Sequence, residues 1–125
     1  MKNTQYFYRN VMFSKSGGQV TLVDIFNPNA VREVLEPWFG TVLQLADGKH
    51  TIEEFTQYMT SQYKGNPPHN LQETINSVFD RLIESKLIVL TDVATELPYY
   101  LSAPCEHLDI EKAKKLLEQD QANLN

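Results

Sequence analysis

The sequence predicts a small α+β domain in which strands come first and helices follow. Three observations support this fold class. Before residue 36, apolar and aromatic side chains gather in short runs separated by Gly, Pro and Asn, as is typical of strands joined by tight turns. After residue 36, apolar side chains recur at helical spacing. The length of 125 residues, of which 42% are hydrophobic, fits one domain that builds its own core.

Three strands are expected in the first 35 residues. Gln5–Phe13 is rich in aromatic and β-branched residues and is followed by a turn that contains a glycine pair. Gln19–Phe26 is the second strand of the resulting hairpin. Ala30–Leu35 suits either a short strand or one helical turn, and we predict a third, short strand there. Together these segments predict a three-stranded antiparallel sheet.

Three helices follow this sheet. Pro37 is well placed at the first position of a helix that ends naturally at Gly48. Thr51 has the capping-box spacing to a glutamate and begins the second helix. The third helix begins near Asn70 and carries a broad apolar face. The apolar run that follows it, Leu87–Leu90, suits either a strand or the end of that helix.

The chain changes character after Asp92. Residues 96–104 are bounded by prolines and are expected to be extended, whereas Asp109–Gln119 is an amphipathic helix with its first residue as N-cap. We therefore predict one domain over residues 1–92 and a C-terminal extension over residues 93–125. The element order is winged helix-turn-helix-like: a three-stranded antiparallel sheet followed by three helices, with one amphipathic helix added in the extension.

Composition and charge argue against several classes of protein. The formal net charge is -5, and the basic residues are scattered, so no stripe could follow the phosphates of a nucleic acid. No apolar run approaches the roughly 18 residues of a membrane span, and the start of the chain lacks the apolar segment of a secretory signal. We therefore expect no nucleic-acid or membrane partner and a cytoplasmic location. A single cysteine excludes an internal disulfide.

Motifs of known enzymes and metal sites are absent from the sequence. There is no GxGxxG, GxxxxGK[ST], HExxH or GxSxG. The run Cys105–His107 combines metal-ligand types, but adjacent ligands rarely enclose one ion, so we interpret it as a loop. Glu73, Asp80 and Glu84 fall near helical spacing, which favours a solvated helix face over acid–base chemistry. We predict a protein that is not an enzyme and that needs no cofactor and no metal.

One stretch of the sequence carries a family resemblance. Residues 36–55, EPWFGTVLQLADGKHTIEEF, combine an apolar helix, a Leu-Ala-Asp-Gly stop and a Thr-Ile-Glu-Glu-Phe restart. With Thr74–Ile88 behind this block and a strand pair ahead of it, the chain resembles the PqqD-like family, the recognition elements for precursors of ribosomally synthesised, modified peptides. The similarity runs from about Val20 to Leu90. Lys86 departs from it, since the family commonly has a glycine there.

The resemblance implies a non-enzymatic domain that binds the leader of a precursor peptide. In that family the leader adds as an antiparallel strand to the third strand, in a groove walled by the third helix. The partner is a maturation enzyme, very often a radical SAM protein. Carried onto this chain, the implied peptide-binding residues are Val31, Arg32, Glu33, Val34 and Leu35 on the edge strand and Leu71, Ile75, Val78, Phe79 and Leu82 on the helix. Phe79 suits the groove and the core equally well.

Two other function classes stay open. One is a winged-helix DNA-binding regulator that reads DNA with residues 70–86, although the net charge of -1 on this helix suits phosphates poorly. The other is a structural or dimerisation subunit in which residues 97–101 and the helix at 109–119 form the contact. A homodimer through the extension is compatible with peptide binding.

Overall fold

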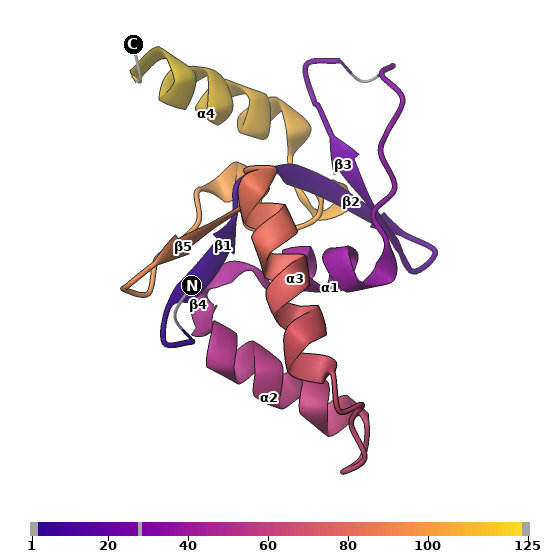
Figure 1. Ribbon diagram of the computed structural model, residues 1–125. Coiled ribbons are helices and arrows are strands. Elements are labelled where there is room, and N and C mark those ends of the chain that lie inside the picture. Colours follow the sequence, from indigo (N-terminus) through magenta and orange to yellow (C-terminus); the bar gives the residue numbers. More distant parts are fainter. Residues whose placement is uncertain (1–2, 28, 124–125) are drawn as a thin grey trace.

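The computed structural model describes residues 3–27 and 29–123 (Figure 1). Within them, five strands form two small antiparallel sheets, and four α-helices and two 3₁₀ turns surround these sheets, so the predicted α+β class is confirmed. The strands are β1 (Tyr6–Arg9), β2 (Met12–Ser16), β3 (Gln19–Val23), β4 (Asp47–Thr51) and β5 (Ile88–Thr91). The helical segments are α1 (Pro37–Leu45), α2 (Ile52–Gln62), α3 (Leu71–Glu84), η1 (Tyr99–Leu101), η2 (Cys105–His107) and α4 (Ile110–Asn123).

The predicted first strand, Gln5–Phe13, is in fact two strands that belong to different sheets. β1 is the central strand of the sheet β4-β1-β5, whereas β2 pairs only with β3. The chain changes sheets at Asn10, whose N–H donates to the carbonyl of Leu87 over 2.9 Å. Phe7 in β1 and Phe13 in β2 are both buried in the main core, whereas Met12 is buried in a second apolar cluster.

The predicted third strand, Ala30–Leu35, is reduced to a single antiparallel bridge between Thr21 and Val34. Asn27 N–H donates to the carbonyl of Asp24 and Ala30 N–H donates to the carbonyl of Asn27, so these groups are bonded to near neighbours in the chain and not to β3. Only the residues around Val34 therefore come within pairing distance of β3.

Residues 47–51, expected as the end of one helix and the start of the next, form β4 alongside β1. Gly48 has a φ of +79°, and a Cβ there would lie 2.4 Å from the carbonyl oxygen of Thr95. It therefore allows the extension to pass close by and does not cap α1, which ends at Leu45. The predicted capping box is confirmed, because Thr51 and Glu54 exchange side-chain and backbone hydrogen bonds at the start of α2.

The main core lies between the sheets and helices α1, α2 and α3. Its centre is a trio of phenylalanines, Phe7, Phe55 and Phe79, with edge-to-face ring centroids 5.0–5.9 Å apart. The apolar run that follows α3 is resolved as a strand, β5, which pairs with β1. No helix among residues 3–27 and 29–123 is long and apolar enough to cross a membrane.

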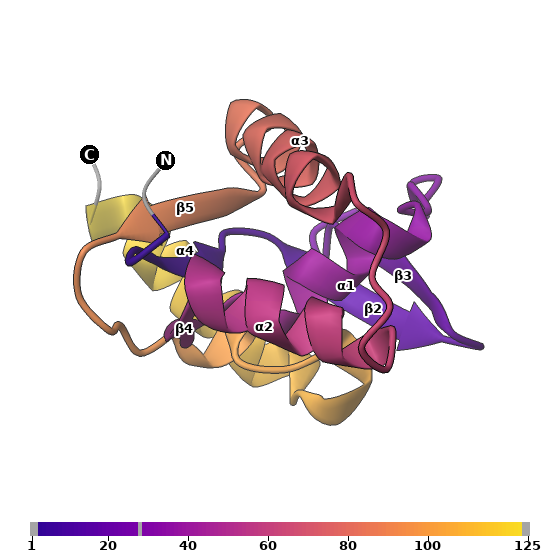
Figure 2. The same cartoon turned by 60° about the horizontal axis from the view of Figure 1, so that its bottom comes forward.

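The C-terminal extension packs on the β2–β3 hairpin through the second apolar cluster, whose buried members are Met12, Ile25, Leu101 and Ala113. In Figure 2 the 3₁₀ turns of the extension lie on the side of the strands away from α3. The predicted N-cap of its helix is confirmed, because an Asp109 carboxylate oxygen accepts a hydrogen bond from Lys112 N–H.

Arg9 joins the extension to the rest of the molecule. The residue is 4% exposed. The guanidinium donates to the carbonyl of Leu101 over 2.7 Å and to the carbonyls of Leu43 and Gln44, at the end of α1, over 3.1 Å each. Burial lowers the pKa of Arg9 below its ordinary value, and the charge of Asp47 acts in the opposite direction. A cation at this point is favourable because the carbonyls at a helix C-terminus carry partial negative charge.

Candidate functional site

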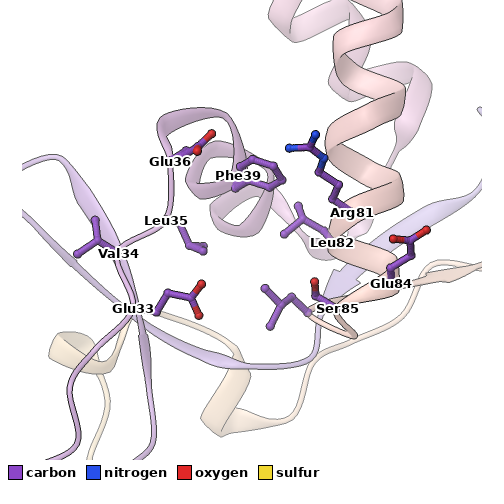
Figure 3. A pocket seen from close by; sticks show the side chains of 10 residues that line it. Glu33, Val34, Leu35, Glu36, Phe39, Arg81, Leu82, Glu84 and Ser85 are labelled. Carbon is purple, nitrogen blue, oxygen red and sulfur yellow. The ribbon is translucent and has the colours of Figure 1, made fainter.

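A groove of about 390 Å³ separates the segment after β3 from the end of α3 (Figure 3). One wall comes from residues 33–36, which include the bridge residue Val34, and from α1. The other comes from the end of α3 and from Leu87, which precedes β5. The lining residues are Glu33, Val34, Leu35, Glu36, Phe39, Arg81, Leu82, Glu84, Ser85 and Leu87.

The floor of the groove is apolar and continuous with the main core. Leu82 is almost completely buried, and Leu35, Phe39 and Leu87 are partly buried against the same core. In Figure 3 the side chains of Leu35, Phe39 and Leu82 face one another across the gap. The floor can therefore accept an apolar side chain without a rearrangement of the core.

The backbone at Val34 is an open sheet edge. The carbonyl of Glu33 accepts from Leu22 N–H over 3.0 Å, and Leu35 N–H donates to the carbonyl of Val20 over 2.9 Å. Because hydrogen-bonding groups alternate in direction along an antiparallel strand, the N–H and C=O of Val34 face away from β3. Neither group takes part in a hydrogen bond among the described residues.

Side chains on this segment alternate in direction as they do in a strand. Figure 3 shows Glu33 and Leu35 directed into the groove and Val34 directed away from it. Val34 as a whole residue is 54% exposed. The segment thus presents a free donor and acceptor to a neighbouring strand and places two side chains over the floor.

The end of α3 forms the far rim of the groove. Lys86 N–H donates to the carbonyl of Ile83, and Leu87 N–H donates to the carbonyl of Leu82, each over 3.0 Å. This pair of bonds is a Schellman motif, and Lys86 occupies its left-handed position with φ +62°. At the position where the resemblance expects glycine, lysine therefore adopts the conformation that glycine favours.

The ten residues that the sequence predicts for peptide binding fall into three groups. Glu33, Val34, Leu35 and Leu82 line the groove. The remaining helix residues are buried core residues on the inner face of α3, namely Leu71, Ile75, Val78 and Phe79. Val31 and Arg32 lie before the bridge and are exposed outside the groove, Val31 completely so.

The structure adds six lining residues that the sequence analysis does not assign to peptide binding: Glu36, Phe39, Arg81, Glu84, Ser85 and Leu87. Among them, Glu84 was expected on a solvated helix face, and it is exposed, as is Arg81. A signal was present in their spacing, because residue 81 lies three and four positions before residues 84 and 85 and so shares one helix face with them, and residue 85 lies three positions after Leu82.

The run Cys105–His107 covers an edge of the β2–β3 sheet. The Glu106 carboxylate accepts hydrogen bonds from the Ser14 hydroxyl and from Lys15 N–H, and the Ser14 bond is the main cause that lowers its pKa. Burial and the charge of Glu106 raise the pKa of the Cys105 thiol. No group of three or more potential metal ligands lies together among the described residues.

No family model matches the chain, and no curated protein and no solved structure matches it. The functional interpretation therefore depends on the groove and on the residues that form it.

Proposed function

We propose that this chain is a non-catalytic peptide-recognition domain of winged helix-turn-helix-like type. It takes up an extended peptide as an added strand at Val34, in the groove walled by α3. The peptide class that the PqqD-like resemblance suggests is the leader of a ribosomally synthesised precursor. The partner that it suggests is a maturation enzyme, such as a radical SAM protein, to which the leader is presented.

The observation that carries this proposal is the outward-facing backbone of Val34 beside an apolar floor. A peptide strand that pairs with Val34 gains two backbone hydrogen bonds at this residue and can place alternate side chains on Leu35 and Phe39. Backbone pairing contributes ~0.5–1.5 kcal/mol for each bond, so the apolar contacts must supply most of the affinity.

DNA recognition by α3 has less support. The side chains that this helix and its cap present to solvent include Glu73, Asp80 and Glu84 against Arg81 and Lys86. An excess of carboxylates on the element that would enter a DNA groove opposes binding to phosphates.

The test begins with a selection of binders from random peptides of about 15 residues, which is long enough for a strand. The full chain is immobilised as bait, and the enriched peptides are measured by titration calorimetry against two proline variants. Val34→Pro removes the edge donor and is expected to weaken binding about tenfold or more. Val31→Pro, in the exposed part of the same segment, is the matched control and is expected to leave Kd within about twofold.

The proposal also predicts where a bound peptide perturbs the protein. Backbone amide shifts on titration are expected at residues 33–36 and 81–87. Failure to enrich any peptide whose binding depends on Val34 would overturn the proposal. Binding of plain duplex DNA that weakens steeply with salt would favour the winged-helix regulator instead.

A further inference from the structure

The rim of the groove carries an uneven set of charges. Three carboxylates, those of Glu33, Glu36 and Glu84, surround the floor together with one guanidinium, that of Arg81. None of these four side chains forms an ion pair or a side-chain hydrogen bond among the described residues. Lys86, two residues after Glu84, does not line the groove. The rim therefore has an excess of negative charge that no side chain of the described residues neutralises.

The two ends of the groove differ in their balance of positive and negative charge. In Figure 3, Arg81 and Glu36 lie towards the same end, beside Phe39, whereas Glu33 lies at the other end, across from Ser85. The guanidinium thus offsets the carboxylate at its own end. The Glu33 end has no cation in the lining.

We infer that the groove selects a basic peptide strand, with a Lys or Arg side chain facing Glu33 and an apolar side chain two residues away on the floor at Leu35. This inference rests on the proposed strand addition at Val34. It specifies the chemistry of the peptide that the edge accepts.

The order of the two side chains in the peptide follows from strand geometry. Directly opposed residues in neighbouring strands point to the same face of the sheet. The peptide residues opposite Glu33 and Leu35 therefore both point into the groove, and the residue between them, opposite Val34, points away. In an antiparallel pair the residue opposite Leu35 comes first in the peptide. The selected motif is thus apolar–any–basic, read from the N-terminus, and parallel addition would reverse it.

Electrostatic interactions with Glu33 are expected to favour a basic over an acidic peptide residue. A cation on the peptide meets Glu33 beside an apolar floor, and a carboxylate placed there would meet Glu33 as a like charge. Opposite charges across an interface mainly select against wrong partners and raise the association rate. Affinity is therefore expected to fall several-fold between about 0.05 M and about 0.5 M NaCl.

The test uses the peptides enriched on the full chain, each made in two forms, as selected and with its basic residues replaced by Glu. The selected form is expected to be basic and to bind about tenfold or more tightly than the reversed form. Glu33→Lys is expected to reduce or invert this preference. Glu53→Lys, an equal charge change on the exposed face of α2, is the matched control and is expected to leave the preference unchanged.

Each outcome has a distinct meaning. Peptides whose binding depends on Val34 but that carry an acidic or neutral residue opposite Glu33 overturn the charge inference alone. An equal effect of Glu33→Lys and Glu53→Lys overturns it as well, because the preference would then reflect only overall charge. Absence of any Val34-dependent binder overturns both the inference and the proposed function. A dimer that dissociates on Val34→Pro would show that a second copy occupies the edge, and would also overturn the inference.

Discussion

The two outer edges of the β2–β3 sheet differ in whether the chain covers them. At the β2 edge, Lys15 N–H donates to the Glu106 carboxylate, and Phe13 N–H forms a hydrogen bond with the Cys105 sulfur, which lowers the pKa of this thiol against the larger effect of burial. At the opposite edge, Val34 presents an N–H and a C=O that have no partner in the described chain. Proteins usually protect sheet edges, since an open edge can pair with another chain.

This difference assigns separate roles to two parts of the molecule. The extension supplies η2 as a cover for one edge, and the groove beside the other edge is left with an apolar floor and a charged rim. The open edge at Val34 is therefore a better candidate for a binding site than the covered edge at β2.

The largest expected effect on stability comes from substitution of Arg9, which joins the C-terminal extension to β1 and α1. Arg9→Met leaves the carbonyl of Leu101 without its donor and removes one donor from the carbonyl of Leu43, which still accepts from Ala46 N–H. The loss of the buried guanidinium is expected to lower the free energy of unfolding by about 3 kcal/mol or more. Urea denaturation followed by circular dichroism measures this loss.

Arg32→Met, at an exposed position, is the matched control and is expected to change the free energy of unfolding by less than about 0.5 kcal/mol. A loss below about 1 kcal/mol in Arg9→Met would mean that the buried guanidinium does not hold the extension in place.

A smaller loss of stability is expected when the contacts that cover the β2 edge are removed. Glu106→Ala removes the acceptor for the buried Ser14 hydroxyl and for Lys15 N–H. It is expected to lower the free energy of unfolding by only about 1–2 kcal/mol, since Glu106 itself is exposed to solvent. The hydrogen bond with Ser14 lowers the pKa of Glu106 in the folded state. The stabilisation is therefore present above the unfolded-state pKa near 4.5 and is lost as the pH falls through the lower folded-state value.

Unfolding of the wild type and of Glu106→Ala over a series of pH values tests this assignment. The difference between the two free energies is expected to be full at neutral pH and to shrink below about pH 4.5. A difference that is constant over the whole series would show that the carboxylate charge does not contribute.

The smallest expected effect on stability concerns Lys86, in the C-terminal cap of α3 beside the groove. Lys86 adopts a left-handed conformation that glycine adopts without strain, so Lys86→Gly is expected to raise the free energy of unfolding by about 0.5–1 kcal/mol. Lys86→Ala removes the same side chain but keeps a Cβ, and it is expected to bring no such gain. Thermal melts of the three proteins compare them directly, and a gain in both variants would point to the charge of Lys86 instead of its backbone.

The structural features that the sequence predicts correctly are those whose cause lies within a few residues. The capping box at Thr51, the N-cap at Asp109 and the helix start at Pro37 each depend on contacts within one turn. The peptide-binding residues were expected from the family resemblance, and of these the groove is lined by Glu33, Val34, Leu35 and Leu82.

The sequence by itself therefore determined the α+β class, the helices and the acidic, cysteine-poor character of the chain. Only the tertiary structure decided that Gln5–Phe13 divides between two sheets, that residues 47–51 pair with β1, and that one edge is covered while Val34 stays open. The physical reason is that strand partners and edge covers come from residues far apart in the chain. Glu106, for example, lies 91 residues from Lys15. Local periodicity carries no information about such distant partners.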